Sequence, residues 1–350
     1  MATLLAHGPD DAASDLAWYL ANVADCCSTY QRDRLTHTPS LLPLLVALLE
    51  KPAVAHSATW ALRSLSQGEA AGRRVAETGD LIARLPALLA HDDNEVVWQA
   101  FPLVGNLAMV EGGGIHARMA AVPGLFAALA NGRSEDASDA VDAIFGLAAV
   151  AAPATCRQIA EDCLPYLAAL LGDRSDGGAV DGAVYNAVAM LRTLARSDGG
   201  ALRARVAAEP GAIAGLVALL DGELSRGDER FPTPNFAWQA ARALRDLSQG
   251  DAGDGGEDRR RVIAAEEGVF PNLAGLLVGG TAAAEPAAAL LANLSGDAPL
   301  RRLIASASGI LPGLAALRDG GSAAAALALD LLALLPRVRL PRAAKRPRGG

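Results

Sequence analysis

The sequence predicts an all-α protein built as a right-handed solenoid of helical repeats, and two apolar patterns with the same period support this prediction. The first is a cluster of the form Leu-x-x-Leu-Leu, or one residue off it, which recurs at intervals of 40, 40, 42, 49, 57 and 41 residues. A period near 40 residues is typical of α-solenoids, in which each repeat buries its apolar face by stacking on its neighbours. The seven clusters begin at Leu45, Leu85, Leu125, Leu167, Leu216, Leu273 and Leu314.

The second pattern is a helix-spaced apolar register that follows each cluster and ends in a leucine. Two registers in step predict two longer helices per repeat, and a shorter amphipathic stretch precedes each cluster, as in 205–220 and 259–277. Glycines in these stretches lie where the chain must turn sharply into the next helix, which glycine does at no steric cost. The glycines are Gly211, Gly268 and Gly309, and the register leucines are Leu65, Leu107, Leu147, Leu194, Leu247, Leu294 and Leu334.

A repeat of short helix, helix and longer helix resembles the armadillo repeat, whose first helix is short and meets the second at a glycine bend. The resemblance covers residues 1–336. It implies one continuous solenoid domain of seven repeats after a partial N-terminal repeat, because Leu4 and Leu5 correspond to Leu48 and Leu49. Residues 337–350 are too basic to join a core, and we expect a disordered tail there.

Composition and hydropathy exclude several other classes. Aromatic residues make up only 4% of the chain, and the alternating pattern of β-strands is absent. Asp142 and Asp330 interrupt the longest apolar runs, so no membrane span is expected. No basic stretch precedes the first apolar residues, so we expect a soluble intracellular protein without a signal peptide. The cysteines have no disulfide or zinc spacing and should be free thiols; they are Cys26, Cys27, Cys156 and Cys163.

Charge is distributed unevenly. Residues 337–350 carry six cations and no acid, so the rest of the chain has a net charge of −14 where the whole chain has −8. An acidic body cannot neutralise phosphates, so nucleic acid is not the expected partner, and a basic protein or peptide is. The tail residues Lys345, Arg346 and Arg348 fit a short nuclear localisation signal, which predicts a protein of cytoplasm and nucleus, although a solvated charge run is the alternative.

The predicted third helices carry tryptophan and asparagine one helical turn apart. Trp18 precedes Asn22, and Trp60 precedes Ser64 at the same place in the next repeat. These pairs resemble the array of the importin-α family, in which asparagine amides bond the backbone of an extended peptide and tryptophans wall the slots for its lysine and arginine side chains. The resemblance implies a nuclear import adaptor that binds a basic peptide in its concave groove, and cation–π attraction suits such a site.

Alignment of the third helices extends this candidate peptide-binding site along the chain. Asp139 and Asp142 stand three residues apart and would point together into the groove. For the tryptophans the alternative is core packing, and for the acidic residues it is a solvated helix face. The candidates are Trp18, Asn22, Trp60, Ser64, Trp98, Asn106, Asp139, Asp142, Asn186, Trp238, Asp246 and Asn293.

No catalytic pattern is present in the sequence. Helical-repeat oxygenases hold two irons with His-Glu pairs, and none of the five histidines here is followed by glutamate. His91, Asp92 and Asp93 form one cluster of ligand-capable side chains, but helix capping by aspartate explains it. The sequence therefore predicts a non-enzymatic adaptor without cofactor or metal. The alternatives are a cytoplasmic armadillo scaffold for a non-basic partner and, less favoured, a helical-repeat enzyme.

Overall fold

The computed structural model describes residues 2–112, 114–132, 136–149, 152–172, 179–221, 236–250, 254–278, 282–319 and 324–335. Every regular element in these ranges is helical, as the repeat pattern predicts. The first repeat has helices of 8, 8 and 14 residues, and the next has helices of 9, 9 and 15 residues. The longer third helix is thus confirmed, while the first helix of these two repeats is as long as the second.

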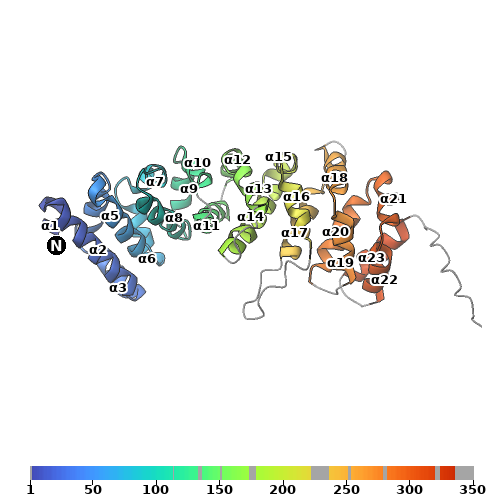
Figure 1. The fold of residues 1–350 in the computed structure, drawn as a ribbon, viewed down its shortest axis with the longest axis horizontal. Helices are drawn as coiled ribbons and strands as arrows, with labels where there is room; N and C mark the ends of the chain where they lie inside the picture. Colours follow the sequence, from blue (N-terminus) through green and yellow to red (C-terminus); the bar gives the residue numbers. More distant parts are fainter. Residues whose placement is uncertain are drawn as a thin grey trace, which may run out of the picture. The chain divides into compact units, whose positions relative to one another are not determined.

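Two helices precede seven helix triplets in the described chain (Figure 1). The two are α1 (Ala2–His7) and α2 (Asp10–Cys26), and a short 3-10 turn (Asp198–Gly200) lies between α14 and α15. The triplets are α3 (Thr29–Thr36), α4 (Leu41–Leu48) and α5 (Pro52–Leu65); α6 (Glu69–Glu77), α7 (Leu81–Leu89) and α8 (Asn94–Ala108); α9 (Ile115–Ala120), α10 (Leu125–Ala130) and α11 (Ala137–Ala149); α12 (Pro153–Asp162), α13 (Leu164–Gly172) and α14 (Ala179–Arg196); α15 (Arg203–Ala208), α16 (Ala212–Ala218) and α17 (Phe236–Leu247); α18 (Gly256–Ala265), α19 (Val269–Val278) and α20 (Ala284–Leu294); α21 (Ala298–Ser306), α22 (Ile310–Asp319) and α23 (Ala324–Leu334).

The helices form two compact regions, residues 1–212 and residues 213–350, which we call the N-terminal and C-terminal regions. Within the N-terminal region the third helices pack in series, α2 on α5, α5 on α8, α8 on α11 and α11 on α14 (Figure 1). Within the C-terminal region α17 packs on α20, and α20 on α23. In each region the third helices therefore form one continuous layer, as stacked repeats require.

The two apolar registers form the core. Every first-register leucine, from Leu45 to Leu314, has no exposed surface. The second-register leucines are buried as well, except that Leu334 is 47% exposed. The buried leucines here are Leu331 in α23 and Leu335 just after its end, four residues apart, so the register falls one residue later than the sequence predicted.

The bend between the first and second helices uses a left-handed backbone conformation. Gly211, Gly268 and Gly309 have φ values of 83°, 86° and 87°, which confirms the predicted glycine turns. In the first repeat the same bend, between α3 and α4, places Ser40 at φ 62°. A serine in this conformation carries a steric cost that glycine avoids.

Among the described residues no single helix is long and apolar enough to cross a membrane, and one pair, α21 with α22, passes by length and composition but is bent by 86°. All four cysteines are free thiols, and Cys156 and Cys163 are buried. Burial raises the pKa of the Cys163 thiol well above its ordinary value, which keeps it protonated and unreactive.

Candidate functional site

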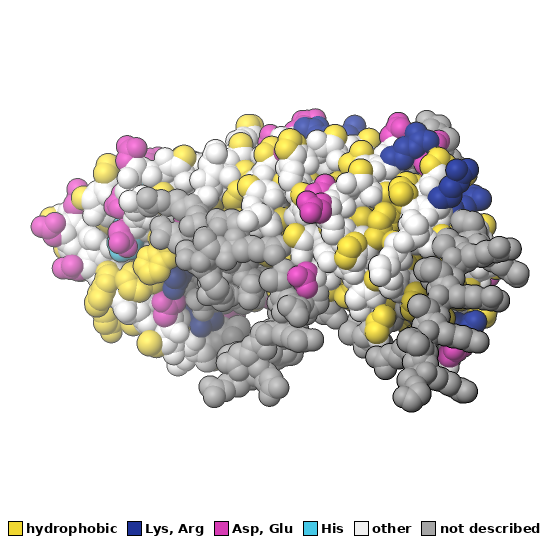
Figure 2. All heavy atoms as spheres, turned by 45° about the vertical axis from the view of Figure 1, so that its right-hand side comes forward, with side chains coloured by type: hydrophobic (Ala, Val, Ile, Leu, Met, Phe, Trp, Pro, Cys, Tyr) yellow, Lys and Arg dark blue, Asp and Glu magenta, His cyan; other side chains and the backbone are white. Residues whose placement is uncertain are grey.

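Tryptophan side chains lie on α2, α5 and α8, the three third helices nearest the N-terminus. Trp18 on α2 is 51% exposed and Trp98 on α8 is 59% exposed, while Trp60 on α5 is half-buried between its neighbours. The Trp18 and Trp60 rings meet edge to face, with centroids 6.3 Å apart and planes at 83°. His56 stacks on Trp60 at 6.1 Å. Figure 2 shows hydrophobic side chains gathered beside a histidine at the left of the view.

Trp60 is also held by hydrogen bonds. Its indole nitrogen donates to the Asp25 carboxylate at 3.1 Å, and Arg63 donates to the same oxygen at 3.1 Å. Ring contacts with Trp18 and His56, together with the hydrogen-bonded N–H, hold the Trp60 indole in place. The Trp60 ring therefore acts mainly in packing, and the open indole faces of the N-terminal region belong to Trp18 and Trp98.

The predicted asparagines use their amides inside the protein. Asn22 donates to the Trp18 carbonyl of its own helix at 2.8 Å. Asn106 donates to the Arg63 carbonyl at 3.2 Å and to the Ser66 hydroxyl at 3.0 Å. Since an amide has two N–H groups, Asn106 keeps only its oxygen for a ligand.

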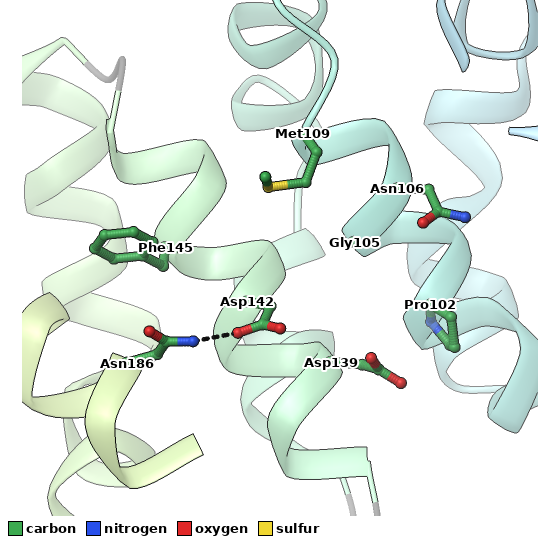
Figure 3. A pocket seen from close by; sticks show the side chains of 8 residues that line it. All are labelled: Pro102, Gly105, Asn106, Met109, Asp139, Asp142, Phe145 and Asn186. Atoms are coloured by element: carbon green, nitrogen blue, oxygen red, sulfur yellow. Dashed lines mark hydrogen bonds between the residues drawn. The ribbon is translucent and has the colours of Figure 1, made fainter. Parts of the chain in front are cut away.

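A cleft of about 400 Å³ opens where α8, α11 and α14 meet, and we call it the acidic cleft (Figure 3). Its apolar lining comes from Pro102 and Met109 on or next to α8 and from Phe145 on α11. The polar lining comes from four predicted candidates, Asn106 on α8, Asp139 and Asp142 on α11, and Asn186 on α14. The complete lining is Pro102, Gly105, Asn106, Met109, Asp139, Asp142, Phe145 and Asn186.

The two aspartates of the acidic cleft are half-buried. Burial raises the pKa of both carboxyls above the ordinary value, and the nearby charge of Asp142 raises the pKa of Asp139 further. The positive charge of Arg63 lowers the pKa of Asp139 in part, and Asn186 donates a hydrogen bond to Asp142, which lowers the pKa of Asp142 in part. No ion pair joins either carboxylate to a cation within the described ranges. The cleft thus holds two incompletely neutralised negative charges beside apolar walls.

Two predicted candidates do not lie on the surface. Ser64 has no exposed surface, and Asp246 is 2% exposed with its carboxylate 2.8 Å from the Arg245 guanidinium. The residue before a core leucine lies only about 100° from that leucine around the helix, so a small helix rotation buries it. Ser64 and Asp246 are therefore buried within the fold, which corrects their assignment to the groove.

The C-terminal region holds Trp238 and Asn293. The Arg242 guanidinium carbon lies 4.2 Å from the centre of the Trp238 ring, which is a cation–π contact within α17. Asn293 donates to the Arg245 carbonyl at 3.0 Å and to the Ser248 hydroxyl at 2.9 Å, repeating the geometry of Asn106. The localisation-signal residues Lys345, Arg346 and Arg348 lie outside the described residues.

Comparison with known proteins identifies the fold. No protein-family model and no curated protein matches the sequence. A solved engineered protein has a TM-score of 0.74 at 23% identity, covering 95% of this chain and 77% of its own. A computationally designed armadillo repeat protein for modular peptide recognition has a TM-score of 0.57 at 21% identity, covering 73% of this chain and 100% of its own. The chain has the armadillo fold.

A natural system matches this armadillo fold as well. A chain from a structure concerned with a phosphorylation switch in the interaction between cadherin and β-catenin has a TM-score of 0.61 at 18% identity. The match covers 90% of the present chain and 64% of that one. At these identities the likeness establishes the fold alone, and the function must be argued from the site.

Helix capping explains the cluster at His91, Asp92 and Asp93. Asp93 is the N-cap of α8 and accepts a hydrogen bond from the Glu95 backbone N–H at 2.9 Å, as the capping interpretation predicted. Within the described ranges no three His, Cys, Asp or Glu side chains are grouped to hold a metal ion.

Sequence reasoning missed several residues of the site. It did not single out Met109 and Phe145, which wall the acidic cleft, or Asp25 and His56, which hold Trp60. Helical spacing could have found the first two, because Met109 follows Gly105 by four residues and Phe145 follows Asp142 by three.

Proposed function

We propose that this chain is a non-enzymatic interaction scaffold that binds an extended basic segment of a partner protein across the third helices of its N-terminal region. The observation that carries the proposal is the acidic cleft, where Asp139 and Asp142 are half-buried without an ion-pair partner among the described residues. A lysine or arginine side chain would supply the missing positive charge. Its aliphatic stem would pack on Pro102, Met109 and Phe145.

Other features of the N-terminal region favour the same ligand. Trp98 and Trp18 present exposed indole faces on α8 and α2, and such faces attract cationic side chains. The net charge of −14 on residues 1–336 would speed the approach of a basic segment at low salt. Among proteins of similar fold, one was designed for peptide recognition and another comes from a cadherin and β-catenin system, which supports a peptide or protein partner.

The finer proposal is that the scaffold serves as an importin-α-like nuclear import receptor, present in cytoplasm and nucleus. Its support is the Trp18 and Asn22 pair and the basic run that contains Lys345, Arg346 and Arg348. A fluorescent fusion tests the localisation. Replacing those three residues with alanine should move the fusion toward the cytoplasm, and an unchanged distribution would leave the run as a solvated charge.

A scaffold for a non-basic partner is the second candidate, and a specific observation favours it. In an importin-α-like receptor the amides of Asn106 and Asn293 would bind a peptide backbone. Here they donate hydrogen bonds to the protein's own carbonyls and hydroxyls. Tyr19 and Met109 add exposed apolar surface, 59% and 70% exposed, which suits an apolar partner.

A peptide panel distinguishes these functions. Twelve-residue extended peptides of equal length would be labelled with fluorescein and titrated with the full chain, one rich in arginine and lysine, one rich in aspartate and glutamate, and one apolar. The proposal expects the basic peptide to bind tightest and to lose affinity as salt rises. Preferred binding of the apolar or the acidic peptide would contradict it and favour the second candidate.

A further inference from the structure

A Trp-Gln-Ala segment occurs in a third helix of each region. Residues 96–101 of α8 read VVWQAF, and residues 236–241 of α17 read FAWQAA. Gln99 and Gln239 are both buried, at 4% and 6% exposed, so the two helices present the same face to the core. Trp98 and Trp238 are therefore structurally matched, and each comes eight residues before the position of Asn106 or Asp246.

The residue one helical turn after each tryptophan differs. In α8 it is Pro102, which lines the acidic cleft, and the Trp98 side chain is 59% exposed. In α17 it is Arg242, whose guanidinium carbon lies 4.2 Å from the Trp238 ring centre. A guanidinium in this position is the group that a basic ligand would place on an indole.

The acidic residue of α17 is paired with a cation of the chain as well. Asp246 lies one turn beyond Arg242 and is paired with Arg245 at 2.8 Å. In the N-terminal region Asp139 and Asp142 have no such ion pair in the described ranges. Asp246 is thus paired within the fold, and the Trp238 indole already carries a cation of the chain.

We propose that Arg242 is an internal occupant of the Trp238 indole face and so confines recognition of basic segments to the N-terminal region. This inference rests on the proposed function, because it assumes that Trp98 and the acidic cleft take a basic segment. Arg242 then determines specificity: it removes one of the two matched tryptophans from competition, so only Trp98 of this pair stays open to a ligand.

Substitution of Arg242 tests the inference in the full chain. The probe is the arginine- and lysine-rich twelve-residue peptide, and the readouts are binding stoichiometry by calorimetry and the indole NMR resonance of Trp238, assigned with Trp238→Phe. Arg242→Ala should expose the ring, add a second binding event and shift the Trp238 resonance. Binding at Trp238 should tighten by about threefold to thirtyfold relative to the control.

Two controls separate ring exposure from charge. Arg302→Ala removes the same charge from an exposed position on α21 and should add no second binding event. Arg242→Met removes the charge but keeps an unbranched side chain that can cover the ring, and it should also leave Trp238 unresponsive.

The outcomes distinguish failure of the inference from failure of the proposed function. If Arg242→Ala matches Arg302→Ala and Trp238 stays unresponsive, the inference is overturned. Equal gains from Arg242→Ala and Arg242→Met would overturn it too, because charge alone would explain them. If the unsubstituted chain binds no basic peptide, the proposed function fails, whereas the Trp238 resonance in Arg242→Ala still reports on the occupancy of its ring.

Discussion

Asn106 donates its side-chain amide to the main-chain carbonyl of Arg63, 3.2 Å away in the last turn of the preceding third helix. The same nitrogen reaches the Ser66 hydroxyl at 3.0 Å. Carbonyls at a helix C-terminus have few intrahelical partners, so a side chain from the next repeat can cap them. Asn106 therefore joins two consecutive repeats, and Asn293 does the same in the C-terminal region.

Replacing Asn106 with alanine should lower the free energy of unfolding by about 1–2 kcal/mol, because two part-buried hydrogen bonds between repeats are lost. Asn293→Ala should have an effect of similar size. Asn22→Ala is the matched control, since Asn22 bonds only within α2, and it should cost less than about 0.5 kcal/mol. Urea denaturation measures all three, and an unchanged stability of Asn106→Ala would show that the asparagine does not link the repeats.

The bend between first and second helices should respond oppositely to two substitutions. Ser40→Gly should raise the free energy of unfolding by up to about 1 kcal/mol, because glycine adopts the observed φ of 62° without steric cost. Gly124→Ala should lower it by about 1 kcal/mol, since Gly124 has φ 77° and an added methyl group would meet no neighbouring atom. Chemical denaturation under identical conditions compares them, and equal signs would refute the conformational explanation.

Trp60 and Trp98 should differ in what their loss affects. Trp60→Ala removes contacts to Trp18, His56 and Asp25 and should destabilise the fold by about 2–4 kcal/mol. Trp98→Ala should change the free energy of unfolding by less than about 1 kcal/mol, while it weakens binding of the basic peptide by about 1 kcal/mol. Thermal melts and peptide titrations of both variants separate packing from binding. A strongly destabilised Trp98→Ala would place that indole in the core instead.

The acidic cleft predicts a pH dependence of stability. Since burial raises the folded-state pKa of Asp139 and Asp142 above the unfolded value of 3.8, the protonated forms stabilise the fold. That stability is lost as pH rises through the raised values. The double variant Asp139→Asn and Asp142→Asn should therefore unfold at higher urea than the unsubstituted chain at pH 7, and the two should converge near pH 3.5. A variant that is less stable at pH 7 would show that the carboxylates are better satisfied than the geometry indicates.

The fold was predictable because the repeat period is imposed by the core. Leu45, Leu85 and their counterparts recur every 40 residues or so since each must fill the same space between stacked helices, and all are fully buried. The register of α23 was not predictable, because Leu334 and Leu335 are adjacent leucines and the pattern alone cannot choose between them.

The candidate site was predictable in part. Placing Asp139 and Asp142 on one helical face needs only their spacing of three residues, and both line the cleft. The burial of Asp246 and the cover of Trp238 by Arg242 depend on the rotation of a helix and the path of a long side chain. Neither leaves a signal in the spacing of residues, so they could be learned only from the structure.

Titration of the basic peptide against a pair of double variants tests the central claim most directly. The cleft variant carries Asp139→Asn with Asp142→Asn, and the control carries Asp11→Asn with Asp92→Asn, which removes the same charge from exposed positions. Calorimetry at pH 7 and low salt should show at least a tenfold weaker Kd for the cleft variant and less than a threefold change for the control, since two half-buried charges act at contact distance and exposed ones are screened. Equal affinity of the two double variants would contradict the claim that the acidic cleft recognises a basic segment.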